Sequence, residues 1–160
     1  MWLFLKNVLF TLVVPGTVAV TVPLLIAADL PPASGLRFLI AAALVVAGTA
    51  IYLWCVWDFA AFGRGTPAPI DAPKRLVVRG LYRYVRNPMY VGVLTVISGW
   101  IVMFGATALL AYALCLWITV HLFVIFYEER RLGQLFGAEY QDYRARVGRW
   151  LPRYHRRNAG

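Results

Sequence analysis

Charged residues are scarce in this 160-residue chain. Only 14% of its residues are Asp, Glu, Lys or Arg, whereas 61% are hydrophobic and the mean hydropathy is +0.68. Soluble domains are about 25% charged. The shortage excludes an ordinary soluble domain and predicts an integral membrane protein with one domain, residues 1–160. We divide it into two N-terminal spans (1–62), a cytoplasmic loop (63–87), a helical hairpin (88–127) and a cytoplasmic tail (128–160).

Cysteine is equally rare, and it carries no recognisable chemistry. Cys55 and Cys115 both lie inside apolar runs, which favours buried free thiols. No cysteine or histidine spacing suits a metal, so no metal site is predicted. The chain also lacks a Ser-His-Asp order and a glycine-rich phosphate loop, which argues against those hydrolase and nucleotide-binding classes.

Acidic residues number seven against sixteen Lys and Arg, and the net charge is +9. Thirteen of the sixteen basic residues fall into two groups. These groups are Lys74, Arg75, Arg79, Arg83 and Arg86, and then Arg130, Arg131, Arg144, Arg146, Arg149, Arg153, Arg156 and Arg157. Such clusters mark the cytoplasmic side of a membrane protein. We therefore expect anionic lipid headgroups as partners, not nucleic acid, and an inner-membrane location with both termini in the cytoplasm.

Three long runs are almost free of charge. Residues 2–28 and 36–62 each exceed the roughly 20 residues that a span needs, and the first is too long for a signal peptide. Residues 88–127 would make one helix about 60 Å long, twice the hydrocarbon thickness. This third run must fold back, and Gly99 and Gly105 place a tight turn near 103–107. The two halves are then helices over about 88–103 and 106–127.

The polar tail has an amphipathic pattern. Apolar residues recur at steps of three and four: Leu132, Leu135, Phe136, Tyr140, Tyr143 and Val147. This spacing predicts an amphipathic helix that breaks at Gly137. The predicted fold is an all-α integral membrane protein with about four transmembrane helices, the last two forming a tight hairpin, and a cytoplasmic C-terminal amphipathic helix.

This topology brings two polar clusters together, residues 74–90 and the pair Glu128–Glu129. Asn87 and Pro88 suit a helix start, and that alone explains them without any ligand. Alternatively, the helix N-terminus and the arginines would attract a carboxylate, and a glutamate would accept hydrogen bonds from hydroxyls or an ammonium. S-adenosylmethionine has all these groups, although a lipid headgroup would use similar ones.

Two motifs carry a resemblance. "KRLVVRGLYRYVRNPMYVG" and, after one hairpin, "EERRLGQLFGAEYQDYRARVGRWLP" resemble the isoprenylcysteine carboxyl methyltransferase and phospholipid methyltransferase superfamily over residues 74–152. The resemblance implies a membrane methyltransferase that uses S-adenosyl-L-methionine. It implies a cofactor site made of Lys74, Arg75, Leu76, Val77, Tyr82, Asn87, Pro88, Met89, Tyr90 and Glu128.

Two positions depart from the family pattern. Asn87 stands where the family usually has histidine, and asparagine cannot transfer a proton near neutral pH. Val124 stands where prenylcysteine enzymes have an arginine, which argues against a prenylcysteine carboxylate as acceptor.

Other ionisable residues lie beside these motifs. His121 precedes Glu128 by two helical turns and so shares its face; it is either a functional group or a histidine bonded to a neighbouring helix. If the acceptor must lose a proton, Glu129 and His121 are the candidate catalytic bases. Asp58 pairs with Arg64 or Arg83, or binds a substrate amine.

We expect methyl transfer to a lipophilic, membrane-embedded acceptor: a prenylcysteine-like carboxylate, a lipid amine or a small apolar nucleophile. The alternative is a non-enzymatic lipid-binding or scaffold protein of the same architecture.

Overall fold

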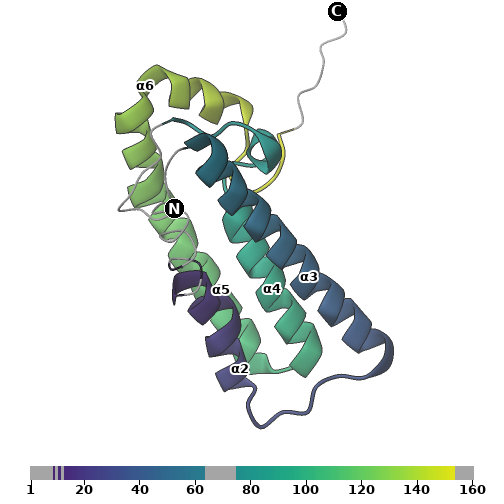
Figure 1. Ribbon diagram of the computed structural model, residues 1–160. Helices are drawn as coiled ribbons and strands as arrows, with labels where there is room; N and C mark the ends of the chain where they lie inside the picture. The colour runs from purple at the N-terminus through teal and green to yellow at the C-terminus, as the bar shows by residue number, and fades with distance from the viewer. Residues whose placement is uncertain (1–8, 10, 12, 64–74, 154–160) are drawn as a thin grey trace, which may run out of the picture.

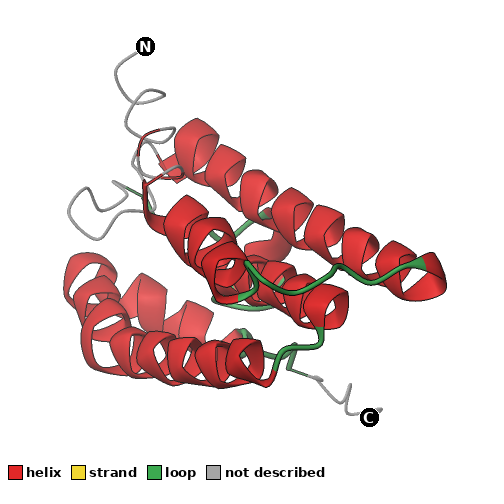
Figure 2. Cartoon of the chain, turned by 90° about the horizontal axis from the view of Figure 1, so that it is seen from below, coloured by secondary structure: helices red, strands yellow, loops and turns green. Residues whose placement is uncertain are grey.

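The computed structural model describes residues 9, 11, 13–63 and 75–153, and within these ranges it is helical without a β-strand (Figures 1 and 2). The α-helices are α2 (Val22–Ile26), α3 (Gly35–Asp58), α4 (Pro88–Phe104), α5 (Thr107–Phe123) and α6 (Glu129–Arg146). Three π-helical stretches, η1 (Thr17–Thr21), η2 (Phe59–Gly63) and η4 (Val124–Glu128), and the 3₁₀ turn η3 (Gly80–Arg83) complete the described elements.

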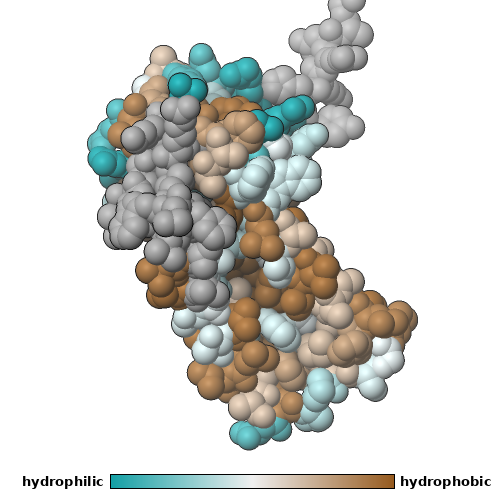
Figure 3. All heavy atoms as spheres, viewed as in Figure 1, coloured by the Kyte–Doolittle hydropathy of each residue, from teal (hydrophilic) through white to brown (hydrophobic). Residues whose placement is uncertain are grey.

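Two helical stretches, Gly35–Phe62 and Thr107–Arg146, are long and apolar enough to cross a membrane. In their most apolar windows only 22% and 11% of the residues are buried, unlike the core helices of a soluble domain. Figure 3 shows the apolar side chains along the bundle and the hydrophilic ones gathered at the end where α6 lies. Shorter apolar helices cover Val13–Ile26 and Pro88–Phe104. These features support a membrane location.

The turn between α4 and α5 lies within the stretch 103–107 expected from the sequence. Gly105 ends α4 with a left-handed backbone (φ 66°), and its N–H donates to the carbonyl of Ile101 at 2.8 Å. Glycine adopts this conformation without steric cost. The last carbonyls of α4 also find partners, because Arg37 Nε donates to Val102 O at 2.6 Å and Ala33 N to Met103 O at 2.8 Å.

Helices α3 and α4 pack with their backbones close together. A Cβ atom on Gly48 would lie 2.6 Å from the carbonyl oxygen of Gly92, and one on Gly99 would lie 2.9 Å from that of Ala41. Small residues permit this close approach. In lipid no hydrophobic effect drives helices together, so their association depends on close packing of this kind. The glycines thus hold α4 close to α3, and this contact positions the first turn of α4 relative to the end of α3.

Helix α6 folds over the end of the bundle at which α3 ends and α4 begins (Figure 1). The predicted break is present: Gly137 has φ 49° and ψ −123° inside α6. Beyond it, Tyr140, Tyr143 and Val147 form a buried cluster against Leu76 in the loop before α4. The chain after the hairpin is thereby fastened to the chain before it.

Candidate functional site

The two motif halves meet at one hydrogen bond. The hydroxyl of Tyr90, in the first turn of α4, donates to Glu128 Oε2 at 3.0 Å. Glu128 ends η4, directly before α6. Because α4 and α5 are joined by a tight turn, the start of one lies beside the end of the other. The contact bridges 38 positions of sequence and places a partly buried carboxylate at the edge of the apolar bundle.

Asn87 lies at the N-cap position of α4, but its side chain does not cap the helix. Instead, its amide nitrogen donates to the backbone carbonyl of Arg149 at 3.1 Å. Asn87 thus stands at the helix start, as the sequence predicts, and its side chain holds the C-terminal segment instead of the helix. Pro88 occupies the first turn of α4 and is fully buried, as a residue without an N–H can be there.

Glu129 lies at the centre of an ion-pair cluster. Its carboxylate, 9% exposed, accepts two hydrogen bonds from Arg149 at 2.6 and 3.0 Å and pairs with Arg86 at 3.1 Å and with Arg144 at 3.9 Å. The bond to Glu129 raises the pKa of Arg149 above its usual value, so this pair stays charged. Both oxygens of Glu129 are engaged, which favours a holding role for this carboxylate over the proton-accepting role expected from the sequence.

His121 is enclosed by tryptophans. Trp150 Nε1 donates to His121 Nδ1 at 2.9 Å, and the ring of Trp117 stacks on the imidazole with centroids 5.1 Å apart. The expectation that His121 shares a face with Glu128 assumed two regular α-helical turns. Residues 124–128 form a π-helical turn instead, which holds more residues per turn and changes that relation.

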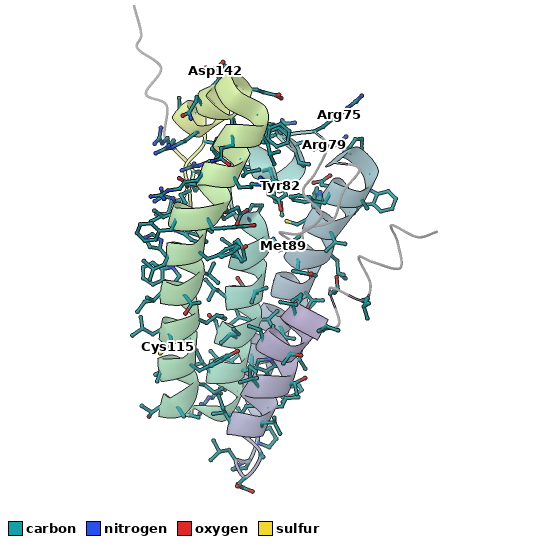
Figure 4. The ribbon with its side chains drawn as sticks, turned by 90° about the vertical axis from the view of Figure 1, so that its left-hand side faces the viewer. Arg75, Arg79, Tyr82, Met89, Cys115 and Asp142 are labelled. Carbon is teal, nitrogen blue, oxygen red and sulfur yellow. The ribbon has the colours of Figure 1, made fainter. Side chains whose placement is uncertain are left out.

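The predicted cofactor loop divides between two clusters. Val77 and Tyr82 pack with Cys55 at the end of α3, and Met89 packs against them (Figure 4). Leu76 packs instead on the cluster of α6, where Tyr143 donates from its hydroxyl to the carbonyl of Tyr82 at 2.7 Å. Burial raises the pKa of Tyr82 well above its ordinary value, so this phenol stays neutral. Arg75 is exposed, and Lys74 lies outside the described residues.

Asp58 is buried below this loop with one oxygen in use. Its Oδ1 pairs with Arg79 Nε at 3.5 Å, rather than with Arg83, while Arg64 lies outside the described residues. Its Oδ2 has no hydrogen-bond partner among the residues that the structure describes. Gly80 (φ 54°) lies directly against this oxygen, and a Cβ there would collide with it.

Two residues at the site were not identified from the sequence. From the sequence, Arg149 belongs to the second basic group and Trp150 has no predicted role, yet they contact Glu129 and His121. The available signal was their position: an arginine and a tryptophan directly follow Val147 and Gly148, where the tail pattern ends.

Comparison with known proteins gives two matches. The chain is 37% identical over 81 residues to methanethiol S-methyltransferase 1 of Bradyrhizobium diazoefficiens, an alignment that covers 50% of this chain and 27% of that relative. No solved structure matches. The sequence pattern of the phospholipid methyltransferase family matches residues 36–139, which include both Tyr90 and Glu128. The chain therefore belongs to the phospholipid methyltransferase family.

Proposed function

We propose that this chain is an S-adenosylmethionine-dependent methyltransferase that acts on a lipophilic acceptor within the membrane. The observation that carries the proposal is the Tyr90–Glu128 hydrogen bond at 3.0 Å. It joins the two motif halves that the family resemblance assigns to one cofactor site, and it lies within the stretch that matches the family. Single-domain organisation, with the cofactor loop before α4, is part of the proposal.

The residues present fit such a cofactor. A buried carboxylate oxygen without a partner costs about 1–3 kcal/mol, and within the described residues 13–63 and 75–153 Asp58 Oδ2 is such an atom beside the loop. It would accept a hydrogen bond from an ammonium or a hydroxyl group. Glu128, which accepts a hydrogen bond from Tyr90, would do the same, and Val77 and Met89 would cover an aromatic ring. Bound S-adenosylmethionine would supply an activated methyl group on its sulfonium.

The protein's own groups would supply position and exclusion of water. The closely packed α3–α4 pair holds Tyr90, and the tail cluster holds the loop, so neither has to reorganise during reaction. The apolar faces of the bundle would admit an acceptor directly from lipid and keep water from the reacting centre. Glu129 would hold Arg86 and Arg149 in place, and His121 would contact the acceptor.

The acceptor remains a choice among three kinds of nucleophile. The relative from Bradyrhizobium is named for transfer to the sulfur of methanethiol, so a small apolar thiol is the first to test. A lipid acceptor, such as a lipid amine, is the second to test, because the family is named for methyl transfer to phospholipids. Val124 offers no charge for a prenylcysteine carboxylate. Incubation of membranes with methyl-labelled cofactor, followed by separate counting of extracted lipids and volatile thioethers, identifies the class.

Binding of the cofactor product tests the proposal directly. Calorimetry in detergent should show that the wild type binds S-adenosylhomocysteine and that Glu128→Ala loses most of that affinity. Glu139→Ala, which removes an exposed carboxylate of α6 beyond Gly137, should bind like the wild type. A folded wild-type protein that does not bind would overturn the methyltransferase proposal and favour the scaffold.

We also propose four membrane spans, an inner-membrane location and a cytoplasmic site. The test uses Val78→Cys, because Val78 is exposed in the loop. The background carries Cys115→Ser, since Cys115 is exposed and Cys55 is buried. An impermeant thiol reagent should label this variant in inverted vesicles and not in intact cells. Labelling from outside would reverse the orientation.

A further inference from the structure

The segment of residues 147–150, which we name the C-terminal strap, lies against the start of α4. Val85 and Gly148 form a parallel β-bridge, and Arg86 N–H donates to the carbonyl of Gly148 at 2.8 Å. The side chain of Asn87 donates to the next strap carbonyl, that of Arg149, at 3.1 Å. Two consecutive carbonyls of the strap are therefore bonded to the two residues that precede Pro88.

The side chains of the strap reach the other motif half. Arg149 forms a two-pronged hydrogen bond with Glu129, the first residue of α6, at 2.6 and 3.0 Å. Such a fork is stronger and more directional than a single ion pair. Trp150 donates to His121 at 2.9 Å, and its ring lies 6.4 Å from that of Tyr90. The strap thus joins the start of α4 to the end of α5 and the start of α6.

The bond from Trp150 also decides where His121 carries its proton. An indole nitrogen can only donate, so His121 Nδ1 must accept and be unprotonated. The neutral imidazole then carries its proton on Nε2. Trp117 stacks on the ring with an interplanar angle of 21°, and Trp150, its plane tilted by 28°, contacts the ring edge through the hydrogen bond, so that both hold its orientation. His121 consequently presents a donor at Nε2 and no free lone pair.

We propose that Arg149 and Trp150 are positioning residues of the methyl-transfer site. Arg149 acts through Glu129 and sets the spacing across which Tyr90 meets Glu128. Trp150 acts through His121 and makes that histidine a hydrogen-bond donor toward the acceptor instead of a base. The inference rests on the proposed function for the identity of the site, while the contacts themselves do not depend on it.

The first experiment compares Arg149→Gln with Arg146→Gln. Both remove one positive charge from the same region, but within the part of the chain that the structure describes Arg146 bonds only to a carbonyl of its own helix, that of Asp142. Calorimetry should show S-adenosylhomocysteine binding weakened about tenfold or more in Arg149→Gln, the size expected for loss of a charged hydrogen bond. Arg146→Gln should bind like the wild type. Arg149→Lys, which keeps the charge and loses the fork, should fall between them.

The second experiment reads the tautomer of His121. The chain has two histidines, so ¹⁵N-histidine labelling in a His155→Gln background leaves one ring to observe. The wild type should show an unprotonated, hydrogen-bonded Nδ1 and a protonated Nε2. Trp150→Phe keeps an aromatic ring but removes the donor, and it should shift the Nδ1 resonance and mix the tautomers. Trp57→Phe, at an exposed position of α3, should leave the resonance unchanged.

The outcomes separate this inference from the proposed function. If the wild type binds cofactor and Arg149→Gln binds it as tightly as Arg146→Gln, Arg149 does not position the site. An unchanged Nδ1 resonance in Trp150→Phe overturns the part assigned to Trp150. If the wild type binds no cofactor, the proposed function fails, and the role of the strap is decided by the histidine resonance alone.

Discussion

Along α3 and α4, glycines let two backbones touch, whereas at the end of the bundle under α6 charged and hydroxyl groups make the contacts. The first region excludes side chains: a Cβ on Gly48, Gly92 or Gly99 would meet atoms closer than 3.0 Å. The second region requires particular side chains, since Glu129 has three arginine partners and Glu128 a tyrosine.

The two regions therefore have different roles: the glycine contact supports the fold, and the polar end carries the groups that could bind a ligand. Contacts between backbones hold two helices in register and offer a ligand nothing to bind. Polar contacts depend on each partner, and an unpartnered buried group is costly. We therefore expect substitutions along the glycine contact to change stability, and substitutions at the polar end to change stability and ligand binding together.

The largest effect should come from Glu129→Gln. Arg86, 6% exposed, would lose its charged partner, and breaking a buried ion pair costs about 3–5 kcal/mol. Denaturant titration in detergent should show this loss. Glu139→Gln removes an exposed carboxylate of α6 and should change stability by less than about 0.5 kcal/mol. Equal effects of the two would mean that the ion-pair cluster contributes nothing.

Gly48→Ala should have the next largest effect. Its Cβ would lie 2.6 Å from the carbonyl oxygen of Gly92 and 2.7 Å from the N of Val96, so backbone atoms would have to move. Overpacking of this kind costs about 1–3 kcal/mol. Gly133→Ala is the matched control, because its Cβ would meet side-chain atoms at 3.8 and 3.9 Å. It should stabilise α6 by about 0.4–1 kcal/mol, and a loss at both sites would contradict the distinction.

Tyr90→Phe tests whether binding belongs only to the polar end. The substitution removes the bond to Glu128, and loss of a hydrogen bond to a charged group is about 1.5–3 kcal/mol, or at least tenfold in S-adenosylhomocysteine affinity. Tyr112→Phe removes a bond to the carbonyl of Val18, made by α5. It should lower stability slightly and leave calorimetric affinity unchanged. Weaker binding in both variants would contradict the prediction that ligand binding depends on the polar end and not on the rest of the bundle.

The smallest effect should follow Arg79→Gln. The Arg79 side chain is 51% exposed and its pair with Asp58 spans 3.5 Å. Half-exposed pairs contribute about 0–1 kcal/mol. Thermal unfolding should therefore shift little, and Arg83→Gln serves as the exposed control in the same loop. A loss of unfolding free energy above about 2 kcal/mol would show that the Asp58–Arg79 pair behaves as a buried ion pair, like the pair of Arg86 with Glu129.

Several parts of this architecture could be predicted because they follow from local constraints. A run of 40 residues without charge is too long for one span, and Gly105 supplies the left-handed residue that a tight turn needs. The break in α6 could be predicted likewise, because Gly137 adopts a positive φ that interrupts the helix. The hairpin brings the start of α4 near the end of α5, since the two helices have 17 residues each. Glu128 lies five residues beyond that end, in η4, so its contact with Tyr90 does not follow from the hairpin alone.

The remaining contacts could not be predicted because they depend on how the tail returns. The partner of Asn87 is a backbone carbonyl 62 positions away, which no local pattern specifies. The partners of Glu129 depend on the direction of α6 after Gly137. Arg79 rather than Arg83 pairs with Asp58 because the 3₁₀ turn η3 begins at Gly80 and sets which arginine faces α3.

The π-helical stretch Val124–Glu128 has a consequence for the two adjacent glutamates. A π turn contains one residue more than the α turn it replaces, so everything after it is rotated relative to a continuous helix. If the same residues were wound as a regular α-helix, the following chain would turn by about 100°, and Glu128 would take approximately the bearing that Glu129 has now. Deleting one residue between 124 and 127 would restore the regular winding without that turn, so Glu128 and Glu129 would keep their present surroundings.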